Sequence, residues 1–226
     1  MKNSKTSAVN KNADPEILYE DEYFLAVNKP SGLATVPAPR IPEHRTLQGK
    51  LRNWALREEK GYKPYPLHRL DRPSSGVILF GKFPRDRQKL VDMFKEPTTK
   101  KTYLALVKWV PKEREGTIDF PLVARTTDKK VPAITHYKTI KLMDNVSLLE
   151  VQIETGRKHQ IRQHLAMIGN PLLLDKDYGD RHFDNEYQRK HKGHGEFFLH
   201  AWKWNAIHPF TGVALEIVAP TDFFEK

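Results

Sequence analysis

Short apolar runs separated by turns recur along the whole chain and predict more strands than helices. Leu149, Val151 and Ile153, for example, share one side of a segment that has the period of a half-buried strand. Strands are predicted at residues 16–20, 23–28, 77–80, 101–110, 117–123, 133–142, 147–153, 198–207 and 213–218. Helices are predicted after Thr46, at 84–95 and at 157–168. Because these helices interrupt the strands irregularly, the predicted fold is α+β, with a mostly antiparallel mixed sheet and flanking helices and loops.

The chain is long enough for one full-sized hydrophobic core, and no repeat or second domain is visible. Residues 1–14 are polar and basic and are predicted to form a disordered tail. Residues 15–226 are predicted to form a single domain. Residues 175–196 are strongly charged and weakly patterned, so a mobile loop is expected there.

Composition narrows the class of partner. The chain has 38 Lys and Arg against 28 Asp and Glu, a formal net charge of +10. This excess favours a polyanion, nucleic acid before membrane, because no basic amphipathic helix with a bulky apolar face stands out. The absence of cysteine excludes disulfides, thiol nucleophiles and cysteine-ligated zinc. No apolar run is long enough to span a membrane and no secretory signal is visible, so we expect a cytoplasmic protein.

The segment 68–76 is the first candidate for chemistry. It places one carboxylate, Asp71, between Arg69 and Arg72, just before a turn and the apolar run 77–80. A tight turn against a buried strand fixes the backbone, so these charged side chains are aimed in defined directions. Nearby cations favour an ionised Asp71. An exposed salt bridge beside a turn would give the same pattern, and such pairs are worth only ~0–1 kcal/mol.

A second charged cluster opens the helix predicted at 157–168. Arg157, Lys158 and His159 come first, and Arg162 follows one turn later. Cations are unfavourable at a helix N-terminus, by roughly 0.3–1 kcal/mol each, whereas an anion is favoured there. The cluster is either a tolerated surface feature or a site for a carboxylate or phosphate. Asp71 is a natural candidate for that carboxylate.

At these two places the chain resembles the RluA family of RNA pseudouridine synthases. His68–Gly76 is similar to the family signature H-R-L-D-x-x-T-S-G, and Thr155–Arg162 to T-G-R-x-H-Q-[IL]-R. Three further elements, at 28–32, 101–103 and 208–212, match in family order. The similarity covers roughly residues 16–218. It implies that 15–226 is a catalytic domain without the S4-like RNA-binding domain that many relatives carry at the N-terminus.

The resemblance also implies a reaction and the residues that perform it. Uracil is detached from its ribose and reattached through C5 in place of N1, so atoms are conserved and no cofactor is implied. Asp71 matches the family's catalytic aspartate and is the expected nucleophile, with Arg162 as its partner. Tyr103 matches the active-site tyrosine that packs on uracil, although its sequence context alone would suggest a core aromatic. The substrate-binding residues implied by the two motifs are His68, Arg69, Arg157, Lys158 and His159.

The implied partner is RNA, and a monomer without membrane association is expected. Segments such as 132–137 and 163–165 resemble the tRNA-directed TruC branch, which implies a target such as uridine 65 of tRNA. Ribosomal RNA remains an alternative substrate. Two departures from the family pattern are Ser74 in place of Thr and Leu174 in place of Gly. The second leaves the shape of the loop at 171–179 open.

Three other hypotheses about the function compete with the pseudouridine synthase hypothesis. A non-catalytic RNA-binding protein would explain the charge but not a carboxylate among arginines. A hydrolytic base glycosylase would also use an aspartate, but it would release free uracil. A histidine metal site is suggested by the proximity of His191 and His194, although no third ligand or H-E-x-x-H spacing is present.

Overall fold

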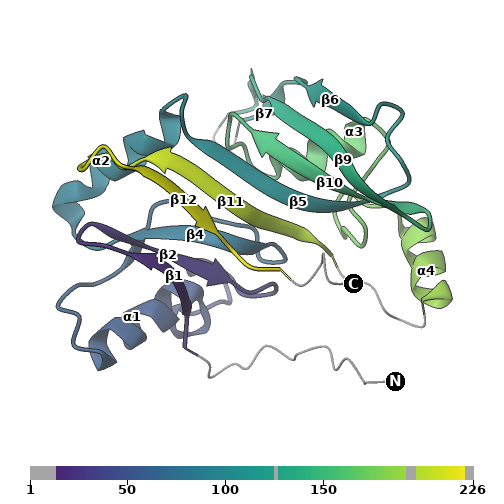
Figure 1. Cartoon of the computed structure of the whole chain (residues 1–226). Coiled ribbons are helices and arrows are strands. Elements are labelled where there is room, and N and C mark those ends of the chain that lie inside the picture. The colour runs from purple at the N-terminus through teal and green to yellow at the C-terminus, as the bar shows by residue number, and fades with distance from the viewer. Residues whose placement is uncertain (1–13, 125–126, 192–196, 222–226) are drawn as a thin grey trace.

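The computed structural model describes residues 14–124, 127–191 and 197–221, so the predicted tail lies outside the described residues except for its last position. The strands are β1 (Glu16–Glu20), β2 (Phe24–Lys29), β3 (Tyr65–Pro66), β4 (Ser75–Gly81), β5 (Lys100–Lys108), β6 (Glu115–Ile118), β7 (Leu122–Val123), β8 (Lys130–Val131), β9 (Thr135–Met143), β10 (Val146–Ile153), β11 (Leu199–Ile207) and β12 (Ala214–Val218) (Figure 1). The helices are α1 (Leu47–Arg57), α2 (Arg87–Asp92), α3 (Gln160–Met167) and α4 (Arg181–Lys190), with short 3-10 helices at Glu43–Arg45, Pro84–Asp86 and Met93–Lys95.

One long mixed sheet organises the described residues. Its strands run in the order β1-β2-β4-β11-β5-β10-β9-β6, while β3 pairs with β4, β12 pairs with β11, and β7 and β8 form a separate two-stranded ribbon. The pairing of β4 with β11 is parallel, and the other strand pairs among the described residues are antiparallel. The prediction of an α+β fold with a mostly antiparallel mixed sheet is therefore confirmed.

The parallel contact between β4 and β11 joins two halves of the sheet. It is short, with Ser75 opposite His200 and Gly76 opposite Ala201. Gly76 has φ +103, and a Cβ there would lie 2.2 Å from the backbone oxygen of Ala201. Only glycine fits this close approach, since any side chain would push the strands apart. The last glycine of the 68–76 motif is thus required by the backbone of the seam.

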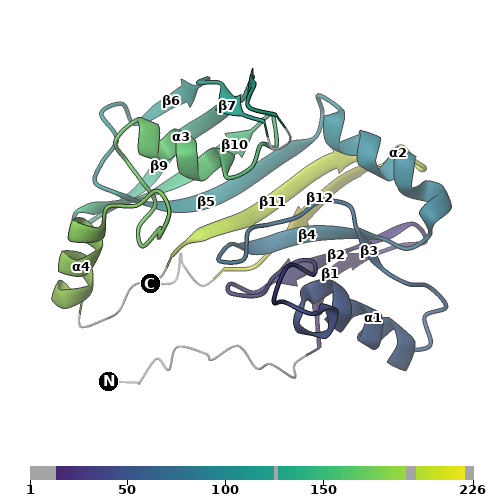
Figure 2. The same ribbon diagram turned by 180° about the vertical axis from the view of Figure 1, so that it is seen from behind.

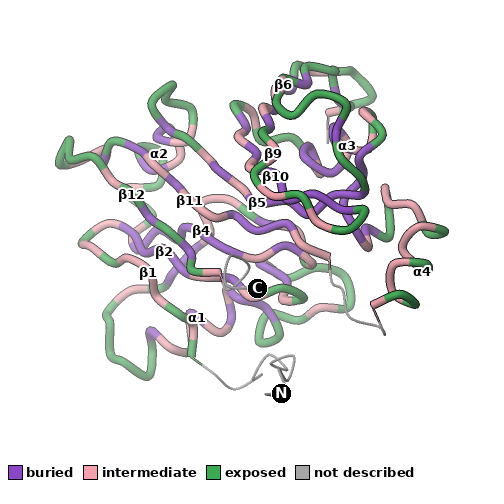
Figure 3. Tube along the Cα trace, turned by 45° about the vertical axis from the view of Figure 1, so that its right-hand side comes forward, coloured by how far each residue is buried: buried purple, intermediate pink, exposed green. Residues whose placement is uncertain are grey.

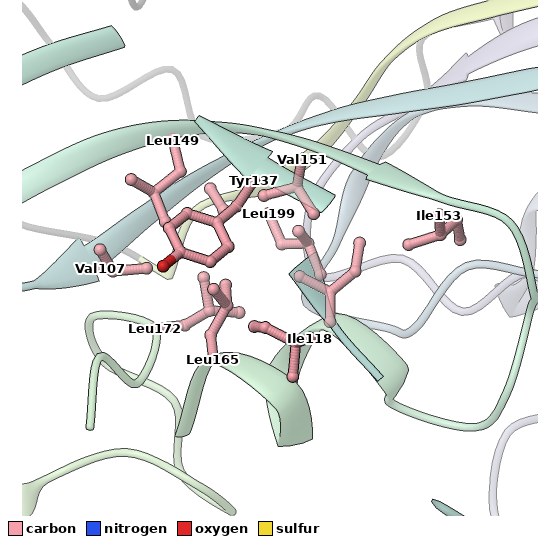
Figure 4. Close-up of a cluster of buried hydrophobic side chains, with 11 residues drawn as sticks. Val107, Ile118, Tyr137, Leu149, Val151, Ile153, Leu165, Leu172 and Leu199 are labelled. Atoms are coloured by element: carbon pink, nitrogen blue, oxygen red, sulfur yellow. The ribbon is translucent and has the colours of Figure 1, made fainter. Parts of the chain in front are cut away.

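Apolar clusters cover both faces of the sheet. On one face, α1 packs over β2 and β4 and α3 packs over β5, β9 and β10, as the view from behind shows (Figure 2). Figure 4 shows the cluster beneath α3, where Leu165 points toward Leu149 and Val151 of the sheet. On the opposite face, α2 lies against one half and α4 against the other. Buried positions therefore follow the central strands along most of their length, whereas α4 and the outer turns are more exposed (Figure 3).

Most predicted elements are confirmed, including the hairpin at 16–20 and 23–28 and the helix capped by Thr46, whose Oγ1 accepts a hydrogen bond from the backbone N–H of Gly49 at 3.2 Å. The predicted strand at 117–123 is divided between β6 and β7. The predicted helix at 84–95 is a short α-helix flanked by 3-10 turns.

Two predictions about the second half are wrong. The helix expected from residue 157 begins only at Gln160, because His159 has φ +53 and cannot continue a right-handed helix. The Oε1 atom of Gln160 instead accepts a hydrogen bond from the backbone N–H of Arg157 at 3.0 Å, which closes the preceding turn. The mobile loop expected at 175–196 contains α4, which Asp180 caps by accepting from the backbone N–H groups of His182 and Phe183.

The motif at 208–212 forms the turn between β11 and β12 and connects it to another turn of the sheet. His208 accepts hydrogen bonds at Nδ1 from the backbone N–H groups of Phe210 and Thr211, at 3.2 and 3.0 Å. Its Nε2 atom lies 2.8 Å from the Oδ2 atom of Asp21, in the turn between β1 and β2. Because Nδ1 accepts, Nε2 carries the proton and donates it to this carboxylate. The motif thus ties the last hairpin to the first.

Candidate active site

Asp71 lies in the loop between β3 and β4, which backbone contacts hold in one conformation. The backbone oxygen of Asp71 accepts a hydrogen bond from the N–H of Ser74 at 3.1 Å and so closes the turn. On either side of it, the oxygen of Leu70 accepts from the hydroxyl of Thr35 at 3.0 Å, and that of Arg72 accepts from the N–H of Gly32 at 2.8 Å. These contacts use main-chain atoms, so they leave the carboxylate of Asp71 available for partners outside the loop. The Asp71 side chain is 25% exposed.

Lys29 holds the same loop from the interior of the protein. Its side chain is fully buried at the end of β2, and its Nζ donates to the backbone oxygens of Pro30, Leu33 and Arg72 at 2.9, 2.7 and 3.2 Å. Burial lowers the pKa of Lys29 to about 7, while the nearby charge of Asp71 acts in the opposite direction. Three carbonyl acceptors also match the three N–H donors of an ammonium group. Lys29 therefore fastens the backbone next to Asp71.

Arg162 approaches Asp71 from α3, on the other half of the sheet. Its Nη1 atom lies 3.3 Å from the Oδ2 atom of Asp71, although 91 positions separate the two residues in sequence. The Nε2 atom of His159 lies 3.5 Å from the Oδ1 atom of the same carboxylate. The prediction that the second charged cluster meets Asp71 is confirmed for these two side chains.

The two arginines that flank Asp71 in sequence do not pair with it. Among the salt bridges of the described residues, Asp71 pairs with Arg162 and His159 alone. Arg69 is exposed. The Nε of Arg72 donates to the backbone oxygen of Gly32 at 3.0 Å. The two arginines that stand next to Asp71 in sequence are therefore not its partners in space, and its cationic partners come from the second motif.

Tyr103 lies in β5, between the clusters beneath α1 and α3, and packs against both. It pairs with Val151 on β10 and with Ala201 on β11, next to the seam between the halves. Burial raises the pKa of Tyr103 to about 12, and the negative charge of Asp71 acts in the same direction. The phenol therefore stays protonated at neutral pH and can donate a hydrogen bond.

The other expected site residues occupy different surroundings. His68 accepts a hydrogen bond from the backbone N–H of Leu79 at 3.0 Å through Nε2, and its ring contacts Phe94. Arg157 donates from Nε to the backbone oxygen of Pro132 at 3.0 Å, and Lys158 is exposed. His68 and Arg157 thus each make one hydrogen bond to the protein backbone, and Arg69, Arg157 and Lys158 are all exposed.

Two carboxylates of the loop after α3 complete the surroundings of Arg162. Asp175 accepts from its Nε and Nη2 atoms at 2.7 and 2.5 Å, and Asp177 accepts from Nη2 at 2.7 Å. Although burial opposes the charged form, these hydrogen bonds raise the pKa of the Arg162 guanidinium. Sequence reasoning missed both aspartates, because acidic residues in a strongly charged segment give no distinct signal.

Tyr178 was missed as well. Its hydroxyl lies 3.1 Å from Nδ1 of His159, and its ring lies 5.1 Å from the Cζ atom of Arg162. Burial lowers the pKa of His159, and the positive charge of Arg162 acts in the same direction while Asp71 opposes it. A neutral His159 can therefore accept a hydrogen bond from Tyr178 at Nδ1 and direct Nε2–H toward Asp71.

A buried polar network explains the segments at 132–137 and 163–165, for which the sequence offered no physical reason. The hydroxyl of Thr135 accepts from Nε2 of Gln160 at 3.0 Å and contacts Nδ1 of His164 at 2.9 Å. His164 donates from Nε2 to the backbone oxygen of Phe120 at 2.9 Å. These bonds attach the start of α3 to β9 and to the chain before β7, and so they fix the helix that carries Arg162.

Two further features lie away from this site. A cavity of about 400 Å³ is lined by α4 and the turn between β9 and β10, with Tyr187 and Asp144 on its walls. In that region His191 stacks on Tyr187, while His194 lies outside the described residues. Within the described ranges, no three or more His, Asp and Glu side chains gather in a way that could hold a metal ion. None of the helices there is long and apolar enough to cross a membrane.

Comparison with known proteins identifies the family. Residues 23–167 match the family model described as RNA pseudouridylate synthase. The chain is 34% identical to tRNA pseudouridine synthase C of Vibrio parahaemolyticus, over 92% of this chain and 90% of that protein. It is 35% identical to ribosomal large subunit pseudouridine synthase C of Salmonella typhimurium, over 91% of this chain and 66% of that protein.

The fold agrees with these sequence matches. Human RNA pseudouridylate synthase domain containing 1 superposes with a TM-score of 0.73, at 23% identity, over 92% of this chain and 84% of that chain. The matched family region contains Asp71, Tyr103, His159 and Arg162, whose side chains lie in or beside one site. By sequence and by fold, the chain belongs to the RNA pseudouridine synthases, a family of isomerases.

Proposed function

We propose that this enzyme isomerises a specific uridine of tRNA, with Asp71 as the nucleophile and the target base flipped out of its stack. The observation that carries the proposal is the contact between Asp71 and Arg162, which two distant motifs bring to 3.3 Å. A carboxylate with one side open to solvent and the other against a cation suits attack on an incoming nucleoside.

The reaction is balanced within the substrate. The N1–C1′ bond of uridine breaks, the uracil turns, and C5 forms the new bond to C1′. The proton at C5 is released to solvent and N1 takes one up, so no oxidant or reductant is needed. Asp71 forms a transient bond either to C1′, as the N1–C1′ bond breaks, or to the uracil ring, and it regains its electron pair when that bond breaks before the product leaves.

The neighbouring side chains take complementary parts. Tyr103, protonated at neutral pH, is assigned to pack on the freed uracil and donate a hydrogen bond to it. Arg69 and Lys158, both exposed, are assigned to the RNA backbone and to the space left by the flipped base. Extrusion of a base costs a few kcal/mol, and such contacts offset it. His159 is assigned to orient Asp71.

The choice of tRNA is supported by the names and the coverage of the relatives. The relatives named tRNA pseudouridine synthase C align along about nine tenths of their own length, at 33–35% identity. By analogy with that branch, uridine 65 is the first position to examine. Ribosomal RNA is the second candidate, because relatives named for the large ribosomal subunit are equally identical. A cytoplasmic monomer remains the expectation from the sequence.

The decisive experiment maps pseudouridine in total RNA from cells with and without this gene, by carbodiimide labelling. A single tRNA position lost with the gene would support the proposal, whereas a lost ribosomal position would redirect it to ribosomal RNA. Release of free uracil by the purified protein would identify a glycosylase and contradict it.

The nucleophile is tested with purified enzyme. Asp71→Asn removes the charge that attacks, so pseudouridine formation should fall by at least about 10³-fold while RNA affinity changes little. Filter binding measures the affinity and carbodiimide labelling the product. If the Asp71→Asn enzyme retained activity, Asp71 would have no place in the mechanism as nucleophile.

A further inference from the structure

The hydrogen bonds of Arg162 are unequally divided among its carboxylate partners. Its contact with Asp71 is a single one of 3.3 Å, whereas Nε and Nη2 form a two-pronged pair with Asp175 at 2.7 and 2.5 Å. Two parallel N–H···O bonds fix the plane of a guanidinium, while a single longer contact does not. The direction in which Nη1 points toward Asp71 is therefore set by Asp175.

Asp175 is a buried carboxylate whose surroundings favour its ionised form. Its side chain is 0% exposed, and that of Arg162 is 4% exposed. Besides Arg162, its Oδ1 atom accepts from the backbone N–H groups of Asp177 and Tyr178, at 3.0 and 3.3 Å. Although burial opposes ionisation, these bonds and the Arg162 charge lower the pKa of Asp175. Both oxygens of the carboxylate accept hydrogen bonds from the protein and the side chain is fully buried, so substrate does not reach it.

The backbone around Asp175 is held on both sides. The N–H of Leu173 donates to the backbone oxygen of Leu106 on β5 at 2.9 Å, and the N–H of Leu174 donates to Oδ1 of Asp184 on α4 at 2.9 Å. The N–H of Gly179 donates to the backbone oxygen of Asp175 at 2.8 Å, and a Cβ at Gly179 would lie 2.3 Å from that oxygen. The backbone that carries the Asp175 carboxylate is thus anchored both to the sheet and to α4.

We propose that Asp175 is a positioning residue for the reaction, which it serves by orienting Arg162 toward Asp71 without touching the substrate. This inference rests on the proposed function, since it assumes that the contact between Asp71 and Arg162 is catalytic. Asp175→Asn would place an amide N–H₂ group against the N–H donors of Arg162, because one of its two oxygens is replaced. The guanidinium would then turn, and its contact with Asp71 would be lost.

The test compares Asp175→Asn with a matched control, Asp180→Asn. Asp180 is an aspartate of the same loop that pairs with Lys108 and caps α4, away from Arg162, and asparagine is an equally good cap. We expect Asp175→Asn to lower kcat about 10²-fold, because a misplacement of about 1 Å has that effect, with the Kd for tRNA changed less than about threefold. Asp180→Asn should leave kcat within about twofold.

A mutant cycle with Arg162 separates positioning from support of the fold. If Asp175 acts through Arg162, adding Asp175→Asn to Arg162→Ala should change kcat less than about threefold, because the interaction is already gone. If the two losses multiply, or if Asp175→Asn alone leaves kcat unchanged, the proposal is overturned.

A crystal structure of Asp175→Asn supplies a readout that does not depend on activity. We expect the separation of Arg162 Nη1 from Asp71 Oδ2 to increase well beyond hydrogen-bond distance, whereas a separation that stays near 3.3 Å would overturn the proposal. If the wild-type enzyme converted no uridine, the proposed function would fail, but this measurement would still decide whether Asp175 orients Arg162.

Discussion

The two halves of the sheet hold their charged groups in different ways. In the first half, Asp71 sits on a loop fixed through main-chain atoms, with Lys29 bonded to three backbone oxygens and His68 to a backbone N–H. In the second half, Arg162 is fixed by side-chain ion pairs, above all with Asp175. The difference suits the proposed roles, because a nucleophile needs a carboxylate that its own loop does not occupy, whereas its cation needs a fixed direction. The first half thus leaves the Asp71 carboxylate to partners from the second half, and the second half fixes the direction of Arg162.

The largest effect is expected when the ammonium group of Lys29 is removed. Lys29→Met removes the buried Nζ donor from the oxygens of Pro30, Leu33 and Arg72, so we expect the free energy of unfolding to fall by about 2–4 kcal/mol. Urea denaturation measures the change. The matched control is Lys60→Met, because Lys60 makes a partly exposed pair with Glu20 worth only ~0–1 kcal/mol. Equal losses in both variants would show that Lys29 does not fasten the Asp71 loop.

The stability of the protein, measured over a range of pH, tests the role of His68 in the first half. Burial lowers the pKa of His68 to about 4, and its Nε2 must stay unprotonated to accept the N–H of Leu79. The unfolded chain takes up a proton near pH 6.5, so it binds more protons than the folded state between about pH 6.5 and 4. Stability should therefore fall as the pH is lowered through this window, by up to about 3 kcal/mol from this group.

His68→Gln keeps an acceptor for Leu79 without a titrating group. The difference in the free energy of unfolding between pH 7 and pH 4 should shrink by the same amount, as measured by urea denaturation at each pH. An unchanged difference would mean that the acid response comes from the ion pairs of the second half instead.

The smallest effect is expected at Leu174, in the loop that carries Asp175. Its φ of +59 costs about 1–2 kcal/mol for a residue with a Cβ. Leu174→Gly removes this cost but loses a partly buried side chain and adds chain entropy, so stability should change by no more than about 1 kcal/mol. Leu173→Ala, at a fully buried neighbour, should cost about 2–5 kcal/mol in the same denaturation experiment.

Local patterns predicted most of the sheet, and the family resemblance named the central pair. The hairpin of β1 and β2 and the helix after Thr46 follow from alternation and capping, which are properties of neighbouring residues. The start of α3 was predicted wrongly because His159 adopts a left-handed conformation that no sequence pattern predicts. The one signal for α4 was the pair Phe183 and Tyr187 at helical spacing behind a capping aspartate, in a segment otherwise charged.

The site was predictable only in part, because long-range contacts decide which charges meet. Asp71 and Arg162 were expected together, and they lie 3.3 Å apart. Asp71 does not pair with Arg69 and Arg72, its neighbours in sequence, because the turn sends their side chains away. Asp175 was noted only for the Leu that precedes it. The positive φ of Leu174 now gives a physical reason why related sequences favour glycine at that position.

The narrow parallel seam between β4 and β11 also decides what holds the two charged groups at their distance. Asp71 belongs to the β4 side, Arg162 is carried by the β10 side, and only Ser75, Gly76 and their two partners join the edges directly. Side-chain packing reinforces this short junction, because Val77 and Leu79 of β4 share one buried cluster with Trp204 and Ala206 of β11. The 3.3 Å contact between Asp71 and Arg162 therefore depends on apolar packing that crosses the seam, several residues away from either charge.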